Sequence, residues 1–520
     1  MDVRILVLLV LLVLLCLAGC TGQVPRQPSA ALPAQGTWLG ATVQAAAGRH
    51  PAGQSGFRLL SDGNEAFAAR AELLRHAQRS LDLQYYIAHD GLSTRLLTAE
   101  LLQAADRGVR VRLLLDDTTS DGRDHQIAVL AAHPNIQIRL FSPLHLGRSH
   151  GVTRTLGRLL HLARQHRRMH NKLWVTDGCV AIVGGRNLGD EYFDAEPELN
   201  FADIDLLGAG PVAGHLAHSF DQYWNSALSV PIQQFLYRPP SIRALARLRV
   251  RLQRSLARAT VEQPDLHVAL TAYRREPRLR NWLERLTWAH SVALWDAPAK
   301  VLSQGVPEPH LLLGAQLAPD LRQVSSELIM ISAYLVPAAD GLVYLTGLAD
   351  GGVRVSLLTN ALEATDVPIV HGGYAPYRRP LLEHGVRLFE LRRQGDGRGS
   401  RYSWSGTSAS ALHSKAAIFD RRKVFIGSLN FDPRSLLWNT EVGVLVDSPV
   451  LAERMRELAL AGMRPTISYE VRLLERDGRR RLVWIAEDNG RRRMLETEPG
   501  SFWRHFHAWL AELIGLENLL

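Results

Sequence analysis

Residues 170–177 read His-Asn-Lys-Leu-Trp-Val-Thr-Asp, and a related stretch, His-Ser-Lys-Ala-Ala-Ile-Phe-Asp, occupies residues 413–420. Both stretches follow the pattern His-x-Lys-x4-Asp. After each aspartate and six intervening residues, a short glycine turn ends in asparagine, as Gly-Gly-Arg-Asn at 184–187 and as Gly-Ser-Leu-Asn at 427–430. Two copies of five fixed residue types at identical spacing indicate an internal repeat, and we expect this repeat to carry the function.

Each motif is predicted to lie on a β-hairpin. Residues 173–183 alternate around an Asp-Gly pair, which is a typical hairpin turn. Because residues i and i+2 of a strand point to the same face, His170 and Lys172 project side by side, and Asn187 returns from the far end. An imidazole can attack or transfer protons, while lysine and amide groups bind phosphate oxygens. The set therefore favours attack on a phosphoryl centre.

The alternative is a pair of ordinary core hairpins with a solvated His and Lys. Lysine usage argues against it, because only four of the 60 basic residues are lysines and the other 56 (60 − 4) are arginines. The four lysines are Lys172, Lys300, Lys415 and Lys423. Two of the four fall in the paired motifs, which solvated surface positions would not explain.

The paired motifs resemble those of the phospholipase D superfamily, whose hallmark is two His-x-Lys-x4-Asp motifs, each with a downstream Gly-[Gly/Ser]-x-Asn. Residues 169–193 resemble in particular the bacterial cardiolipin synthase C branch, and the resemblance extends from about residue 56 to the C-terminus. It implies an α/β fold of two similar domains, each a mixed or parallel sheet flanked by helices, which together form one pseudo-symmetric catalytic unit.

The rest of the chain also indicates a duplication. Ala-Asp-Arg-Gly-Val-Arg-Val at 105–111 matches Ala-Asp-Gly-Gly-Val-Arg-Val at 349–355, and in both places a helical pattern leads into a buried strand. The predicted organisation is a first α/β domain over residues 56–235, a basic helical connector over 236–300, a second α/β domain over 301–460 and a C-terminal extension with an amphipathic helix over 461–520.

The resemblance also implies roles for the motif residues. The catalytic set is His170, Lys172, Asp177, His413, Lys415 and Asp420, with the aspartates in a supporting role. His170 is implied to be the nucleophile and His413 the acid and base, although the sequence alone is symmetric. Phosphate contacts are expected from Gly185, Asn187, Ser428 and Asn430.

A carboxylate is expected to hold each imidazole through its other nitrogen. Glu441 matches the downstream acid of the family, and Asp203 occupies the corresponding place in the first half, with five extra residues intervening. No metal or other cofactor is expected, because lysines and amides can neutralise the phosphoryl oxygens.

The N-terminal segment predicts export. Residues 1–19 have signal-peptide length, and Leu-Ala-Gly-Cys at 17–20 resembles a lipobox, so Cys20 is expected to be the lipidated mature residue. Thr21, where an Asp would direct retention, favours the outer membrane; the alternative is an uncleaved hydrophobic anchor. In both cases the body lies on the periplasmic side of a bacterial envelope membrane. Residues 20–55, rich in Ala, Gly, Gln and Pro, are predicted to be a flexible tether.

Charge suits an anionic partner, since the chain carries a net charge of +9. A basic amphipathic helix is predicted at 242–258 and an aromatic one at 501–514; packing on the body is the default for both, and contact with lipid is the alternative. Cys179 is expected to be a small buried hydrophobe.

The predicted function is a phosphatidyltransferase of the cardiolipin synthase type, working through a phosphohistidine. The implied partners are the membrane surface, phosphatidylglycerol and, as a second lipid, phosphatidylethanolamine; an accessory protein is an open option. The first alternative is a phospholipase D or phosphodiesterase that hydrolyses phospholipid or, less favoured, nucleic acid. The second is a non-enzymatic envelope lipoprotein, against which the two intact motifs argue.

Overall fold

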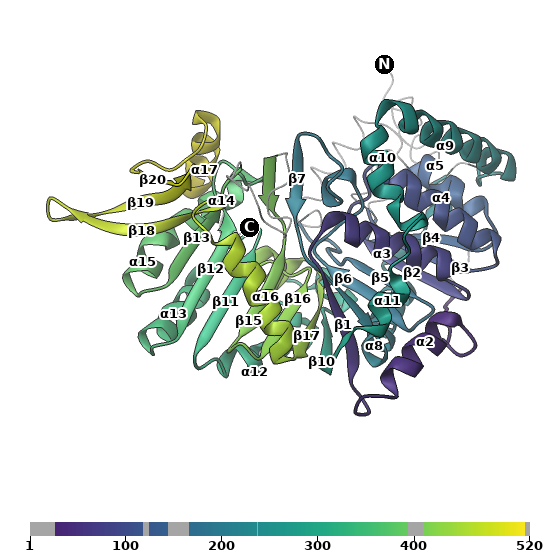
Figure 1. The fold of residues 1–520 in the computed structure, drawn as a ribbon, viewed down its shortest axis with the longest axis horizontal. Coiled ribbons are helices and arrows are strands. Elements are labelled where there is room, and N and C mark those ends of the chain that lie inside the picture. The colour runs from purple at the N-terminus through teal and green to yellow at the C-terminus, as the bar shows by residue number, and fades with distance from the viewer. Residues whose placement is uncertain (1–26, 118–123, 144–165, 237, 394–408, 515–520) are drawn as a thin grey trace, which may run out of the picture.

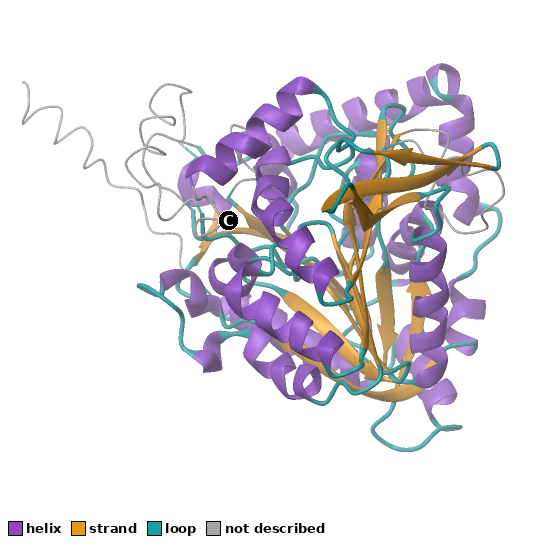
Figure 2. Cartoon of the chain, turned by 90° about the vertical axis from the view of Figure 1, so that its left-hand side faces the viewer, coloured by secondary structure: helices purple, strands orange, loops and turns teal. Residues whose placement is uncertain are grey.

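The computed structural model describes residues 27–117, 124–143, 166–236, 238–393 and 409–514. The chain forms two halves of the same topology, joined edge to edge where β1 of the first half pairs with β10 of the second. The α/β fold of two similar domains is confirmed. Figure 1 shows the two halves side by side, and Figure 2 shows strands enclosed between helices.

The first sheet has three central parallel strands, β2, β3 and β4, with antiparallel partners on both sides. In spatial order its strands are β1 (Ser55–Leu60), β8 (Asp205–Ala209), β6 (Val180–Gly184), β5 (Leu173–Thr176), β2 (Ser80–Tyr85), β3 (Arg110–Asp116), β4 (Ile136–Phe141) and β9 (Ser229–Pro231).

The second sheet repeats this order and adds a hairpin. Its strands are β10 (Thr287–Trp295), β17 (Val442–Asp447), β16 (Lys423–Gly427), β15 (Lys415–Phe419), β11 (Glu327–Ser332), β12 (Arg354–Asn360), β13 (Arg387–Leu391), β18 (Ser468–Arg476), β19 (Arg479–Asp488) and β20 (Arg491–Leu495). A separate two-stranded sheet pairs β7 (Leu199–Ala202) with β14 (Ala409–Leu412), one strand from each half.

Helices also repeat between the halves. The first half contains α3 (Gly63–His76), α4 (Leu92–Asp106), the short α5 (Asp124–Ala128) and α8 (Pro211–Asn225); the second contains α12 (Leu313–Arg322), α13 (Ala338–Asp350), α14 (Pro368–Tyr374), α15 (Arg378–Glu383) and α16 (Pro449–Gly462). One apolar core lies between the two sheets and includes α8 and α16, while each sheet has a second core on its other face.

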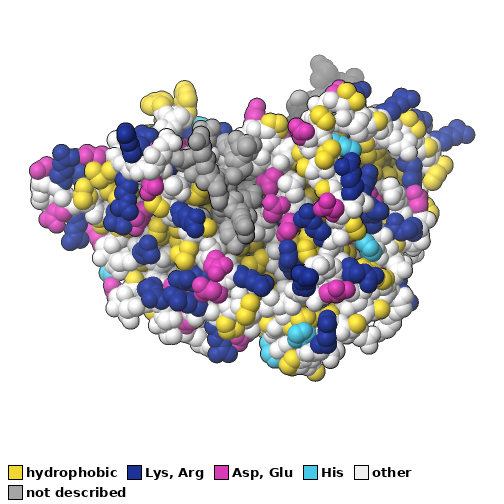
Figure 3. Space-filling model, viewed as in Figure 1, with side chains coloured by type: hydrophobic (Ala, Val, Ile, Leu, Met, Phe, Trp, Pro, Cys, Tyr) yellow, Lys and Arg dark blue, Asp and Glu magenta, His cyan; other side chains and the backbone are white. Residues whose placement is uncertain are grey.

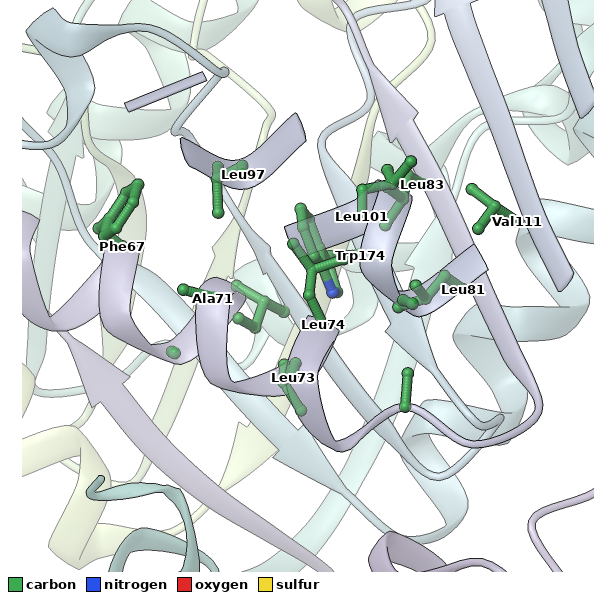
Figure 4. Packing of buried hydrophobic residues seen from close by; sticks show 14 of the residues in the cluster. Phe67, Ala71, Leu73, Leu74, Leu81, Leu83, Leu97, Leu101, Val111 and Trp174 are labelled. Carbon is green, nitrogen blue, oxygen red and sulfur yellow. The ribbon is translucent and has the colours of Figure 1, made fainter. Parts of the chain in front are cut away.

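Helix α3 illustrates how the sequence builds this packing. Asp62 caps its first turn by accepting a hydrogen bond from the Glu65 amide at 2.9 Å. Phe67, Ala71 and Leu74 then recur at helical spacing and are buried against β2, β5 and α4 (Figure 4). Burying a large apolar side chain contributes about 1.5–3 kcal/mol, so this stripe fixes the helix on the sheet.

The predicted tether is wrong for its described part. Residues 38–47 form α2 (Trp38–Ala47), capped by Thr37, and Leu39, Val43 and Ala46 are buried against the first half. The small, weakly charged residues resemble a linker in composition, yet the apolar positions recur at i, i+4 and i+7 and form a helical stripe. The signal-like segment and Cys20 lie outside the described residues.

The domain boundaries also differ from the prediction. The basic connector comprises α9 (Ile242–Glu262), α10 (Pro264–Thr271) and α11 (Leu279–Glu284), but β10, assigned to the connector, is the second half's counterpart of β1. Likewise β18 pairs with β13 as β9 pairs with β4. By this strand pairing the second half spans residues 287–476.

The connector helix α9 packs on the first half as predicted, burying Leu245, Leu252 and Ala259 and leaving most of its arginines exposed. Its Arg249 pairs with Asp106 at 2.7 Å. None of the helices in the described ranges has both the length and the apolar character needed to cross a bilayer.

Candidate active site

The two histidine motifs lie at the carboxyl edge of the parallel strands, where ligands bind in open α/β sheets. Lys172 immediately precedes β5, whose Leu173 pairs with Gln84 near the end of β2. In the second half Lys415 opens β15 and pairs with Ser332, the last residue of β11. Both hairpins, β5–β6 and β15–β16, form as predicted.

Each histidine is held by a carboxylate from the other half. The Nδ1–H of His170 donates to both oxygens of Glu441 at 3.0 Å, and the Nδ1–H of His413 donates to Asp203 at 2.7 Å. This pairing leaves Nε2 of each ring as the atom free to react. Sequence reasoning found both carboxylates, but it did not reach the crossing, because spacing along the chain gives no information about contacts between halves.

Backbone hydrogen bonds enforce the crossing. The amide of His170 donates to the Thr440 carbonyl at 2.9 Å, next to Glu441, and the amide of His413 donates to the Ala202 carbonyl at 2.9 Å, next to Asp203. The β7–β14 pair extends the second of these contacts. These backbone hydrogen bonds therefore hold each histidine opposite its carboxylate.

Both motif lysines are buried and converge on the site. Lys172 Nζ donates to the His170 carbonyl at 2.7 Å, and Lys415 Nζ donates to the His413 carbonyl. Burial lowers the pKa of Lys172 well below its ordinary value, and the charge of Lys415 lowers it further against the opposing carboxylates. Burial likewise lowers the pKa of Lys415. Two buried cations that affect one another are a receptor for an anion.

The same surroundings keep both imidazoles neutral at rest. Burial, followed by the charges of Lys172 and Lys415, lowers the pKa of His170 well below its ordinary value. Burial and Lys415 lower the pKa of His413 to about 4, against the raising effect of Asp203. A neutral imidazole is the form that can attack phosphorus or accept a proton.

The two orienting acids differ. Burial raises the pKa of Glu441 to about 7, although Lys172 and the Ser428 hydroxyl oppose the shift. Burial acts in the same direction on Asp203, but the hydrogen bond from His413 and the charge of Lys415 outweigh it and hold that pKa below its ordinary value.

The glycine turns lie against these acids. Ser428 Oγ donates to Glu441 and accepts from the Val442 amide at 3.0 Å. At the matching Gly185, a β-carbon would lie 2.5 Å from the Asp203 carboxylate, so a side chain has no room there. The structure thus gives Ser428 and Gly185 a place beside the acids; their contact with phosphate stays a prediction.

The two asparagines have unequal surroundings. Asn187 accepts from the Ile87 amide at 3.2 Å and donates to the Tyr192 hydroxyl at 2.9 Å. Asn430 is equally buried, but its Oδ1 has no hydrogen-bond partner among the described residues. Their contact with phosphate also stays a prediction.

The motif aspartates lie at the far ends of the hairpins and do not contact the histidines. Asp177 accepts from the amides of Gln78, Arg79 and Ser80, and Asp420 accepts from the three amides at 325–327. Both adopt positive φ, 49° and 51°, at the hairpin turn. Each aspartate therefore holds the backbone at the start of the neighbouring strand, which is a structural, supporting role.

Several residues near the site were missed. Asp296 accepts from the Glu441 amide at 2.7 Å and from Lys300 Nζ at 3.0 Å, a buried pair that supports Glu441 from behind. Tyr86 lies edge-on to His170, with ring centroids 5.1 Å apart, and Tyr192 to His413 at 5.3 Å. The Asp296–Lys300 pair could have been found from the sequence, because lysine is so scarce that Lys300 was as notable as the two motif lysines.

Comparison with known proteins agrees with this geometry. A family model described as "Cardiolipin synthase, PLD-like domain" matches residues 71–224 and 317–459. Cardiolipin synthase C of Escherichia coli K12 is 38% identical over 488 residues, which cover 93% of this chain and 99% of that protein. Cardiolipin synthase A of Pseudomonas fluorescens is 25% identical, covering 82% of this chain and 71% of its own.

Among solved structures, phosphatidylserine synthase of Haemophilus influenzae superposes with a TM-score of 0.53 at 14% identity, covering 82% of this chain and 92% of that one, a likeness of fold. The family model covers both motif-bearing regions, and the relatives span most of the chain. The chain therefore belongs to the cardiolipin synthase family of phospholipase D-like proteins.

Proposed function

We propose that this protein is a phosphatidyltransferase of the cardiolipin synthase type, which moves a phosphatidyl group from one phospholipid to the headgroup alcohol of another. The observation that carries the proposal is the crossed pairing of His170 with Glu441 and of His413 with Asp203. It makes one site from two halves, which brings together two neutral imidazoles and two buried lysines.

In the first step, His170 Nε2 attacks phosphorus, an N–P bond forms, and the P–O bond to the leaving headgroup alcohol breaks. His413 gives that alcohol a proton. A bound phosphodiester supports this role, because its negative charge offsets the two lysines and raises the pKa of His413 from its resting value.

In the second step, His413 takes a proton from the hydroxyl of the acceptor lipid, whose oxygen attacks phosphorus as the N–P bond breaks. Two inversions give net retention at phosphorus. Lys172 and Lys415 stabilise the negative charge that develops on the phosphoryl oxygens in both transition states. Glu441 and Asp203 keep both rings in the reactive tautomer throughout.

The lipid substrates place the enzyme at a membrane, which the cardiolipin synthase relatives support. We propose phosphatidylglycerol as acceptor and donor, with phosphatidylethanolamine as a second donor, whose ethanolamine leaves in the first step. The sequence at 17–20 supports export and a lipid anchor at Cys20, with the outer membrane as the favoured site. Whether an accessory protein is required is an open part of the proposal.

The test is lipid analysis of a cardiolipin-deficient bacterium that expresses the full chain, His170→Ala or His413→Ala. We expect cardiolipin with the intact chain and none with either variant at equal protein levels. Phosphatidic acid in place of cardiolipin would assign hydrolysis instead. An unchanged lipid profile, with the intact protein present in the membrane fraction, would contradict both activities for the chain acting without an accessory protein.

A further inference from the structure

The C-terminal helix α17 (Phe502–Ile514) carries its aromatic side chains on the outside. Phe502, Trp503, Phe506 and Trp509 are 75%, 66%, 39% and 54% exposed. Successive rings in this set lie between 5.6 and 6.1 Å apart, so they form one continuous patch, the aromatic face of α17. Hydrophobic side chains project at the upper left of Figure 3, where Figure 1 places this helix.

The opposite side of α17 attaches the helix to the protein. Ala508 packs on Gly372 of α14 so closely that a β-carbon on Gly372 would lie 2.3 Å from the Ala508 carbonyl oxygen. Arg504 donates to the carbonyls of Leu362 and Thr365 at 2.9 and 2.6 Å. Small and polar residues thus face inward, which is the reverse of an ordinary surface helix. The expected docking of this helix on the body is confirmed, and the contact is made by Ala508 and Arg504 rather than by the aromatic rings.

This attachment places α17 at the same edge of the sheet as the site. The loop that receives Arg504 follows directly after β12, whose last residue is Asn360. Asn360 exchanges two hydrogen bonds with the backbone of Leu412, at 2.7 and 2.9 Å, and Leu412 precedes His413. The helix is therefore attached to the loop that directly follows Asn360, the residue that holds the strand leading to His413.

Exposed arginines lie on the strands that lead into α17. They are Arg479, Arg480 and Arg481 on β19 and Arg491, Arg492 and Arg493 on β20. Asp488 on β19 forms ion pairs with Arg392 and Arg493, and Glu498 forms one with Arg378. Arg491 and Arg492 make no ion pair with any described residue. Exposed tryptophans beside unpaired cations are the combination that membrane interfaces with anionic lipid favour.

We propose that the aromatic face of α17 docks on the phospholipid bilayer, with its rings among the headgroups and the neighbouring arginines on lipid phosphates. A contiguous exposed apolar patch marks an interaction surface, and exposed arginines lie on the two strands that precede this one. The proposal rests on the proposed function, which requires both substrates to come from a bilayer. Docking through α17 turns the His413 edge of the sheet toward that bilayer.

Vesicle binding alone is a poor test, because the full chain also carries the apolar run at residues 5–18. A contact reporter is available instead, since Trp503 and Trp509 are the exposed tryptophans among those the structure describes. The full chain is reconstituted in vesicles of equal parts phosphatidylglycerol and phosphatidylcholine with brominated acyl chains. We expect the bromine to quench tryptophan fluorescence, and the Trp503→Phe, Trp509→Phe double variant to lose that quenching.

A second variant measures the consequence. Replacing Trp503, Phe506 and Trp509 by Ser is expected to lower the ratio of turnover on vesicles to turnover on monomeric short-chain phospholipid by roughly tenfold or more. Val306→Ser with Val343→Ser, two exposed apolar positions away from α17, is the control and keeps the ratio.

Equal quenching in wild type and the Phe variant would overturn the proposal, as would an unchanged ratio in the Ser variant. A light-scattering mass that falls only in the Ser variant would assign the surface to a second copy of the chain, and would overturn it as well. Quenching without any turnover would count against the proposed function and leave the docking surface supported.

Discussion

The two halves of the molecule share one topology, yet they complete their histidines differently. In one crossed pair His170 meets Glu441, whose second partner is the Ser428 hydroxyl. In the other pair His413 meets Asp203, the shorter acid, beside a glycine that leaves no room for a side chain. The duplication supplies a symmetric frame, and two residue differences within it, Glu441 against Asp203 and Ser428 against Gly185, make the surroundings of the two histidines chemically distinct.

The difference lies in proton affinity. Burial raises the pKa of Glu441 to about 7, whereas His413 and Lys415 hold the pKa of Asp203 below its ordinary value in spite of burial. The acid with the lower pKa suits the imidazole that gains a positive charge as it carries protons. This contrast supports His413 as the acid and base and His170 as the nucleophile, a choice that the symmetric sequence leaves open.

Removing the histidines breaks the comparison most severely. We expect His170→Ala to lower transfer by about 10⁴-fold or more, because no covalent intermediate forms, and His413→Ala to lower it by about 10²- to 10⁴-fold. A donor lipid with labelled phosphorus, followed by neutral denaturing gels, should label the His413→Ala protein and not the His170→Ala protein. Label on the His170→Ala protein would exchange the two roles.

The lysines should behave alike where the histidines do not. Both are buried and both donate to the carbonyl of their own histidine. We expect Lys172→Met and Lys415→Met each to lower turnover by about 10²- to 10³-fold, the loss typical for one donor to a developing oxyanion. Lys423→Met is the matched control, because Lys423 pairs with Asp320 outside the site. Strongly unequal losses would mean that the phosphate lies in one half.

The orienting acids should differ in their pH dependence. Below about pH 7 Glu441 takes up a proton and no longer accepts from His170 as an anion, so wild-type turnover should fall as the pH is lowered through 7. Glu441→Gln is expected to raise the activation free energy by about 1.5–3 kcal/mol, which lowers turnover about tenfold to hundredfold, and to remove the fall in turnover at low pH, the acid limb of the profile. Asp203→Asn should cost a similar amount and keep the limb, since that pKa is lowered. Turnover profiles from pH 5 to 9 decide between them.

Much of this comparison was accessible from sequence. The spacing of the motifs predicted both hairpins, and the short matches at 105–111 and 349–355 predicted equivalent strands, because local patterns determine local elements. The crossing was not accessible. It depends on hydrogen bonds such as that between His170 and the Thr440 carbonyl, which join residues far apart in the chain.

One error and one unforeseen contact share a physical cause. Composition suggested a tether before residue 55, and the amphipathic pattern at 501–514 did not say which face of α17 meets the body, because burial depends on what an element packs against. In α2 a few apolar side chains suffice, since Leu39 meets the core of the first half. In α17 the contact surface offered by Gly372 and nearby carbonyls accepts Ala508 and Arg504, and leaves the rings outside.

The aspartates of the motifs offer a comparison in stability. Asp177 is fully buried, while Asp420 is partly exposed and its amide partners at Ser325 and Ser326 are near water. We expect Asp177→Ala to lower the free energy of unfolding by about 3 kcal/mol and Asp420→Ala by about 1 kcal/mol, because water can satisfy the second set of amides. Urea titrations measure both. Equal losses would mean that water reaches the amide partners of the two aspartates equally.

The smallest expected effect tests why one acid has a serine and the other a glycine. The Ser428 hydroxyl lowers the pKa of Glu441, so Ser428→Ala should raise that pKa and move the acid limb to higher pH. The lost hydrogen bond is worth about 0.5–1.5 kcal/mol, so turnover at pH 7 should fall roughly twofold to tenfold and should recover at high pH. Ser414→Ala, which removes a hydroxyl bonded to the Ala202 carbonyl, should leave the limb in place.

This variant also identifies the group behind the limb. Burial raises the pKa of Asp296 and of Asp432 to about 7 as well, so a limb near pH 7 does not by itself name Glu441. Ser428 donates to Glu441, and neither of the other two acids accepts its hydroxyl in the structure. A limb that moves in Ser428→Ala therefore belongs to Glu441. A limb that stays fixed belongs to Asp296 or Asp432. The asymmetry of the two halves then originates behind Glu441, for example at the buried pair of Asp296 and Lys300.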